Sequence, residues 1–199
     1  MLACAVALVL LMDVSGSLTE QHMRQQIDAT SRALTSERIT DIIRTLPGGL
    51  AVKAIAFGPW PDVIAPWTII RTPEQASEFA LQLRQYQRDE QIQNGTYLGR
   101  ALDFAIDQFE HTPCRPDEMI IDVSTDGEAD PTPVQQARDR AEESMIRINA
   151  IGIGRPELLS SFLYQSVITP DGFHMTVESW QDFERAIRRK IALEIASVN

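Results

Sequence analysis

Six short apolar runs recur along the chain, and each has the length and the polar flanks of a β-strand. They lie near residues 5–12, 50–57, 63–70, 118–124, 147–153 and 172–177. The first run, within MLACAVALVLLM, shows no alternation of polar and apolar positions, which is typical of a central strand with both faces covered. The pattern therefore predicts a sheet whose first strand is fully buried.

Between the predicted strands, apolar residues recur every three or four positions, which is the spacing of an amphipathic helix. Five such stripes are present: Met23, Ile27, Thr30 and Leu34; Ala76, Phe79, Ala80 and Leu83; Leu98, Ala101, Leu102, Ala105, Ile106 and Phe109; Val134, Ala137, Ala141 and Met145; and Trp180, Phe183, Ile187, Ile191 and Ile195. We expect these stripes to pack in the core. For the fourth helix, Thr132 is the expected N-cap and Pro133 the first helical residue.

Strands that alternate with helices indicate an α/β fold: a doubly wound, mostly parallel six-stranded sheet with helices on both faces. One connection differs, because only GPWPD at residues 58–62 separates the second and third strands. A crossover helix does not fit there, so this pair is predicted to be an antiparallel hairpin. Pro66 places its second strand at an edge of the sheet. With 199 residues and 44% apolar content, we expect one domain spanning residues 1–199.

The composition is acidic, with a formal net charge of -10 and a pI near 4.7. Nucleic acid and anionic membranes are therefore not expected as partners, because binding phosphate requires clustered Lys and Arg. Only Arg188, Arg189 and Lys190 form a basic run, interpreted as cations that complement the dipole of a terminal helix. The apolar N-terminal stretch is too short to span a bilayer and has no basic segment before it, so membrane insertion is not expected.

Cys4 and Cys114 are the only cysteines, and neither has a neighbour at zinc-ligand spacing. Cys4 precedes Asp13 by nine residues, and Cys114 precedes Asp126 by twelve. If both aspartates end neighbouring parallel strands, both cysteines lie near the opposite edge of the sheet. A disulfide and a pair of buried thiols are then equally compatible with the sequence.

Polar residues follow two of the predicted strands. The first strand leads into Asp13, Ser15 and Ser17, and the fourth leads into Asp126. Thr96, in Asn-Gly-Thr, precedes the third helix. In a doubly wound sheet, ligands bind beyond the carboxyl ends of the strands, where chain progression reverses. Hydroxyl and carboxylate oxygens that meet there would form a site for a hard divalent cation.

These motifs, DVSGS, then GTYLGRAL, then TDG, resemble in order and spacing the metal-ion-dependent adhesion site of von Willebrand factor A domains. The resemblance covers nearly the whole chain and implies a single domain of that type. It implies that Ser15, Ser17 and Thr96 ligate the metal directly, while Asp13 and Asp126 act largely through bound water. The implied ion is Mg²⁺, with Mn²⁺ or Ca²⁺ as alternatives.

Three further segments, IDVSTDG, INAIGI and DFERAIRRKIALEIA, are similar to a bacterial branch of this superfamily whose members are largely exported and have no assigned activity. Members of that branch usually follow a longer export signal. A periplasmic or secreted location is therefore expected if an upstream signal has been removed, and a cytoplasmic one otherwise. The sequence leaves the oligomeric state open.

A cation held by three neutral hydroxyls and two acids keeps positive character and an open position. We therefore expect a metal-dependent protein-binding module that recognises an Asp or Glu side chain of a partner protein. The alternative in which Asp13 and Asp126 only cap helices does not explain why the motifs converge.

A metal-dependent hydrolase is a second possibility, with activated water or Ser15 as nucleophile. Its base is missing, because His22, His111 and His174 fall in segments away from the serine loop. We therefore do not expect an enzyme. A third possibility is an assembly module with a vestigial metal site, in which Trp60 and Trp67 form an exposed patch; the competing expectation is that they pack beneath the edge strand.

Overall fold

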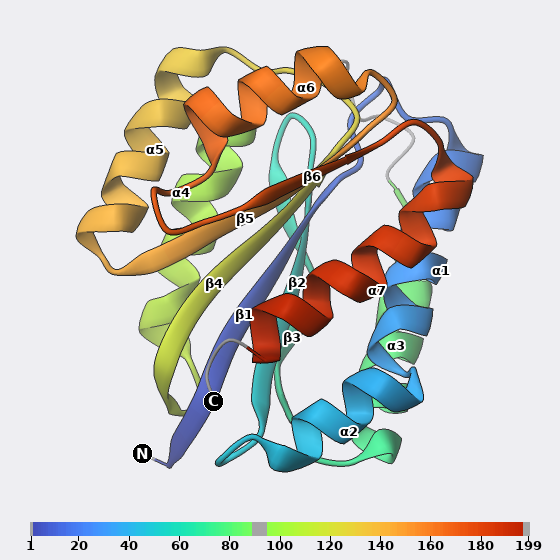
Figure 1. The fold of residues 1–199 in the computed structure, drawn as a ribbon, viewed down its shortest axis with the longest axis vertical. Helices are drawn as coiled ribbons and strands as arrows, with labels where there is room; N and C mark the ends of the chain where they lie inside the picture. The colour runs from blue at the N-terminus through green and yellow to red at the C-terminus, as the bar shows by residue number, and fades with distance from the viewer. Residues whose placement is uncertain (1, 89–94, 197–199) are drawn as a thin grey trace.

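The computed structural model describes residues 2–88 and 95–196, so Asn94 of the predicted Asn-Gly-Thr motif lies outside the described residues. Six strands form one sheet: β1 (Ala3–Asp13), β2 (Leu50–Phe57), β3 (Pro61–Ile70), β4 (Arg115–Thr125), β5 (Ile146–Ile153) and β6 (His174–Val177). Their order is β3-β2-β1-β4-β5-β6 (Figure 1). Only the pair of β2 with β3 is antiparallel, which confirms the predicted fold class, the hairpin and the edge position of Pro66.

Helices cover both faces of the sheet (Figure 1). They are α1 (Glu20–Leu34), α2 (Glu37–Thr45), α3 (Pro73–Arg84), α4 (Leu98–Gln108), α5 (Pro131–Glu143), α6 (Pro156–Phe162) and α7 (Trp180–Ala196), with a 3-10 turn at Phe109–His111 and a π-turn at Leu163–Val167. The first core cluster packs α1, α2, α3 and α7 against one face. The second packs α4, α5 and the end of α6 against the other.

The central position of β1 in the sheet explains why its sequence is apolar without interruption. Leu8, Leu10 and Met12 point into the first core cluster, whereas the alternate residues Val9 and Leu11 point into the second. Because β1 lies between β2 and β4 and beneath helices on both sides, neither of its faces meets water. The prediction of a fully buried first strand is confirmed.

The start and the end of α5 differ from the prediction. The helix begins at Pro131, and the carboxylate of Asp130 caps it by accepting a hydrogen bond from the Thr132 N–H at 3.0 Å. Proline needs no N–H partner at the first helical position, so Asp130 and Pro131 satisfy the same rule two residues earlier than Thr132 and Pro133. Met145 lies beyond the end of the helix, has a φ of 58° and is 83% exposed, so it is not a core residue.

Lys190 was interpreted with Arg188 and Arg189 as a cation that complements a helix dipole, but it is fully buried and forms specific ion pairs. Its ammonium lies 2.5 Å from an oxygen of Asp122 on β4 and 2.6 Å from an oxygen of Glu194 one turn further along α7. Asn149 on β5 donates a hydrogen bond to the same oxygen of Glu194 at 3.0 Å. Burial, and then the charge of Asp122, raise the pKa of Glu194 to about 8, although Lys190 opposes the shift.

A disulfide joins Cys4 and Cys114, whose Cα atoms are 5.8 Å apart. It connects the beginning of β1 to the residue before β4, at the end of the sheet opposite to Asp13. The sequence left this pairing open. Among the described residues, no helix has both the length and the apolar character needed to cross a bilayer.

Candidate metal centre

The five predicted site residues lie at the carboxyl end of the sheet. Asp13 is the last residue of β1, and Ser15 and Ser17 lie in the turn that follows it. Asp126 comes directly after the last residue of β4, the strand beside β1. Thr96 lies two residues before the start of α4. Ser15 is buried, Thr96 and Asp126 are partly buried and Ser17 is exposed, so the site opens to the surface.

A chain of hydrogen bonds connects four of these side chains. The Thr96 hydroxyl donates to the Ser15 hydroxyl at 3.1 Å, and the Ser15 and Ser17 hydroxyl oxygens are 3.0 Å apart. Ser17 then donates to a carboxylate oxygen of Asp126 at 2.8 Å. Three loops that are distant in sequence therefore bring their oxygen atoms to one place.

Asp13 is buried beneath this chain. One carboxylate oxygen accepts the Ser15 N–H at 2.8 Å, and the other accepts the hydroxyl of Thr125 at 2.7 Å. Burial raises the pKa of Asp13 to about 6, with a smaller contribution from the negative charge of Asp126, while the hydrogen bonds from Ser15 and Thr125 oppose the rise. A nearby cation would favour the charged form of this carboxyl group.

Two residues outside the predicted set support the backbone of the loop. The side-chain amide of Gln26, buried on α1, donates to the carbonyl oxygen of Asp13 at 2.8 Å and accepts from the Ser124 hydroxyl at 2.6 Å. One guanidinium nitrogen of Arg88, Nη1, shares its hydrogens among three carbonyl oxygens of the same loop, at 2.8 to 3.3 Å, on Val14, Ser15 and Leu18.

The sequence carried a signal for Gln26. It lies three residues after Met23 and four before Thr30, so it is a polar residue on the helix face that is predicted to be buried. Arg88 lies in no periodic segment of the sequence, and nothing in the sequence indicated it.

The donor set suits a small, hard cation. Oxygen atoms bound to Mg²⁺ at about 2.1 Å in octahedral geometry are about 3 Å from their neighbours. The Thr96–Ser15 and Ser15–Ser17 oxygen separations, 3.1 and 3.0 Å, are close to that spacing. Across residues 2–88 and 95–196, no group of three or more His, Cys, Asp and Glu side chains is placed to bind a metal. The side-chain oxygens that meet at this place are the hydroxyls of Thr96, Ser15 and Ser17 and the carboxylate of Asp126.

Two of the three histidine side chains have partners outside the candidate site. The ring of His22 stacks on Trp180 with centroids 5.3 Å apart, and His174 bonds to the Ser160 hydroxyl at 2.9 Å. His111 is exposed in the 3-10 turn after α4. The hydroxyls of Ser15 and Ser17 bond instead to each other and to Thr96 and Asp126.

Solved structures with the same architecture include proximal thread matrix protein 1 (PTMP1) from the mussel byssus, with a TM-score of 0.71 and 15% identity over 97% of this chain. BatB from Bacteroides thetaiotaomicron has a TM-score of 0.66 and 19% identity, and the match covers 97% of this chain and 100% of BatB. A von Willebrand factor type A protein from Catenulispora acidiphila has a TM-score of 0.64 and 16% identity, over 96% of this chain and 43% of its own.

This chain spans 48% of the mussel protein. A further structure of that protein, with zinc in its MIDAS motif, has a TM-score of 0.65 and 15% identity, over 96% of this chain and 46% of its own. These similarities establish a von Willebrand factor A-like fold.

No curated protein matches the sequence. One family matches residues 3–199, and its description is "Protein of unknown function (DUF1194)". The chain therefore belongs to the DUF1194 family and has the fold of a von Willebrand factor A domain.

Proposed function

We propose that the protein is a divalent-metal-dependent binding module that recognises an Asp or Glu side chain of a partner protein. The observation that carries this proposal is the hydrogen-bonded chain of Thr96, Ser15, Ser17 and Asp126 at the carboxyl end of the sheet. In the proposed site, Ser15, Ser17 and Thr96 bind Mg²⁺ directly, and Asp13 and Asp126 bind it largely through water. Mn²⁺ and Ca²⁺ are alternative ions.

The choice of a carboxylate follows from charge. Three neutral hydroxyls leave most of the cation's charge uncompensated, so an anionic oxygen is the favoured ligand at an open position. The net charge of -10 repels an acidic partner at long range, but salt screens this repulsion beyond about 8 to 10 Å. The mussel protein, which has a similar fold, has been solved with zinc in its MIDAS motif, and this supports a metal-binding role for the present chain.

The disulfide supports an exported location, which we include in the proposal. Disulfides form and persist in oxidising compartments and are rare in the cytosol. The bond between Cys4 and Cys114 therefore fits a periplasmic or secreted protein better than a cytoplasmic one.

Calorimetric titration of metal-free protein with Mg²⁺ tests the proposed site. We expect saturable heat for the native protein and for Ser77→Ala, a matched control whose hydroxyl bonds to a backbone carbonyl on α3. Asp13→Ala and Ser15→Ala are expected to lose most of the binding, because each removes an oxygen from the proposed site. Equal heats in all four proteins would contradict the metal site.

A further inference from the structure

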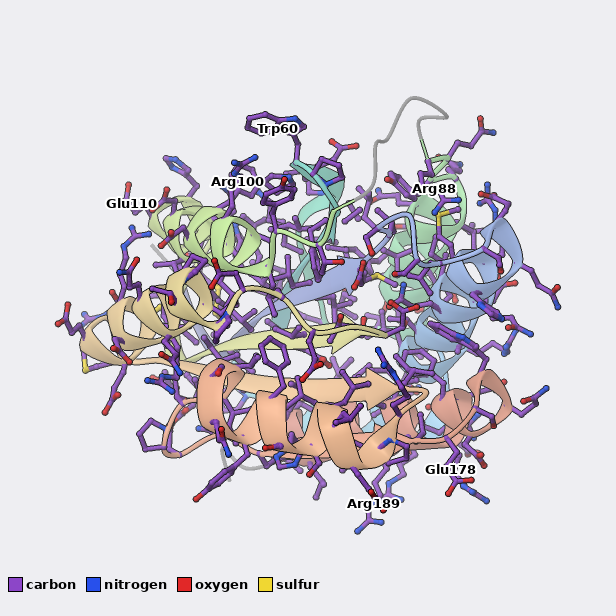
Figure 2. The ribbon with its side chains drawn as sticks, turned by 90° about the horizontal axis from the view of Figure 1, so that it is seen from above. Trp60, Arg88, Arg100, Glu110, Glu178 and Arg189 are labelled. Carbon is purple, nitrogen blue, oxygen red and sulfur yellow. A yellow bond between two sulfur atoms is a disulfide. The ribbon has the colours of Figure 1, made fainter. Side chains whose placement is uncertain are left out.

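Two exposed aromatic rings and an arginine lie beside the candidate metal centre. The guanidinium carbon of Arg100 is 4.2 Å from the ring centroid of Trp60 and 5.0 Å from that of Tyr97. Trp60 is 72% exposed and Tyr97 is 50% exposed, although both rings are large and apolar. Figure 2 shows Trp60 and Arg100 together at one edge of the molecule, pointing outward.

One backbone hydrogen bond and one from the Arg100 side chain connect the elements that carry these side chains. The N–H of Tyr97 donates to the carbonyl oxygen of Gly58 at 3.3 Å, and Arg100 donates to the carbonyl oxygen of Pro59 at 2.9 Å. The tip of the β2–β3 hairpin is therefore tied to the start of α4. Side chains that are already ordered lose little conformational entropy when a partner binds.

A pocket of about 340 Å³ opens between the starts of α4 and α5. Thr96, Tyr97 and Gly99 line one side of it, and Ala129 and Pro133 line the other. Thr96 also belongs to the candidate metal centre, so the pocket and the proposed cation share a wall. A short peptide segment bound to the cation through one side chain would place its next side chains over this pocket.

The charges around the pocket indicate what it accepts. Asp103, Asp130 and Arg100 also line it, and Asp103 is paired with Arg140 at 3.2 Å. A second carboxylate would meet these acids, whereas an apolar side chain would lie against Tyr97, Ala129 and Pro133. Trp, Tyr and Arg are also the residue types that contribute most to protein interfaces.

We infer that the partner is a peptide segment with an acidic residue for the cation and an adjacent large apolar side chain for this pocket. Trp60, Tyr97 and Arg100 cover the apolar side chain from the hairpin side. The inference rests on the proposed function, because the cation anchors the acidic residue.

The test uses three terminally blocked peptides, Gly-Asp-Phe-Gly, Gly-Asp-Ser-Gly and Gly-Asp-Asp-Gly, titrated into isotope-labelled protein with excess Mg²⁺ and followed by NMR. We expect the Asp-Phe peptide to bind about tenfold more tightly than the Asp-Ser peptide, which is the effect of burying part of one aromatic side chain. Ala129→Phe fills the pocket and is expected to remove this preference while the Asp-Ser peptide binds as before.

Trp60→Ala provides a second test that does not depend on the folding of the filled variant. It is expected to lower the affinity for the Asp-Phe peptide about threefold or more. The matched control is Tyr164→Ala, which removes an exposed aromatic ring, 68% exposed, from the π-turn and outside this pocket.

The outcomes separate the two proposals. No Mg²⁺-dependent binding of any peptide would contradict the proposed function itself. Equal Mg²⁺-dependent binding of the Asp-Phe and Asp-Ser peptides would overturn only the pocket assignment. Tightest binding of the Asp-Asp peptide would also overturn it, because Arg100 would then be acting as a second anion site.

Discussion

Arg88 contributes to the candidate metal centre through the loop backbone and places none of its own atoms in the proposed donor set. Its nitrogen Nη1 donates to three carbonyl oxygens of the loop that carries Ser15 and Ser17. Hydrogen bonds from a charged group contribute about 1.5 to 3 kcal/mol each. A loop held in this way would keep its hydroxyls at the proposed cation site at a lower entropic cost.

Arg88→Lys is therefore expected to weaken Mg²⁺ binding about fivefold, because the Lys side chain keeps the charge but is shorter, so its nitrogen does not reach the place that Nη1 of Arg88 occupies among the three carbonyl oxygens. Calorimetry measures the affinity, and a thermal melt checks that the variant folds. Arg84→Lys, whose side chain pairs with Asp28 on the surface, is the control and should bind as the native protein does. Unchanged affinity in Arg88→Lys would show that the loop needs no such support.

The buried cluster of Lys190, Asp122 and Glu194 holds one cation and two carboxyl groups, so it is neutral when one carboxyl keeps its proton. This agrees with a pKa of Glu194 raised to about 8, against 4.5 for an unperturbed glutamate. Between these two values the folded state binds more protons than the unfolded state. The proton on Glu194 therefore stabilises the folded state fully below about pH 4.5, and this contribution is lost as the pH rises through about 8.

Urea denaturation between pH 6 and pH 8 measures this effect. The free energy of unfolding of the native protein is expected to fall by at least about 1 kcal/mol more than that of Glu194→Gln over this interval. The lowered pKa of His174 acts in the opposite direction but is common to both proteins. Parallel pH profiles would mean that Glu194 is ionised throughout.

The sequence indicated where the five candidate residues lie, because each is next to a recognisable strand or helix, and their binding of a metal stays a prediction. Lys190 was misinterpreted because adjacent charges in a sequence look alike, although successive helix positions point in directions about 100° apart. The periodicity nevertheless carried a signal, because Lys190 and Glu194 each lie three residues after an isoleucine of the apolar stripe in this helix.

Among the secondary-structure elements, the strands were predicted more completely than the helices. Helices α2 and α6 have 9 and 7 residues, which is too short for a periodic stripe to stand out, and tertiary contacts of Ile39, Ile43 and Phe162 hold them in place. The predicted aromatic patch is divided between two environments. Trp60 is exposed at the hairpin tip, whereas Trp67 is partly buried and donates to the carbonyl oxygen of Gln108 at 3.1 Å.

Gly99 sets the distance between α4 and α5. A Cβ atom at this position would lie 2.7 Å from the backbone carbon of Pro133, so any larger residue forces the two helices apart. Gly99→Ala is expected to destabilise the protein by about 1 to 3 kcal/mol in urea denaturation. Gly127→Ala is the matched control, because a Cβ atom there meets nothing within 4 Å. Equal stability of the two variants would mean that the helices separate at little cost.

In the whole molecule, the disulfide and the candidate site lie at opposite ends of the sheet. The disulfide closes a loop with a sequence separation of 110. It lies where β1 and β4 begin, at the end of the sheet opposite to Asp13. Reducing it is expected to lower the free energy of unfolding by about 4 kcal/mol, because the unfolded chain gains conformational freedom. Mg²⁺ affinity should stay the same.

Cys4→Ala/Cys114→Ala is the control, and its stability should not respond to reductant. Mass analysis after thiol alkylation of native protein from an oxidising compartment should find no labelled cysteine. Two labelled thiols would contradict both the disulfide and the argument that it gives for export.

The position of β1 has a consequence for how the molecule opens. This strand is paired on both sides and covered on both faces, so its amide hydrogens should exchange with deuterium only when the entire chain unfolds. The turn that carries Ser15 and Ser17 begins directly after that strand. If the edge strands β3 and β6 open locally, β1 should remain folded. Asp13, Ser15 and Ser17 would then keep their positions, because they lie at the end of β1 and in the turn after it.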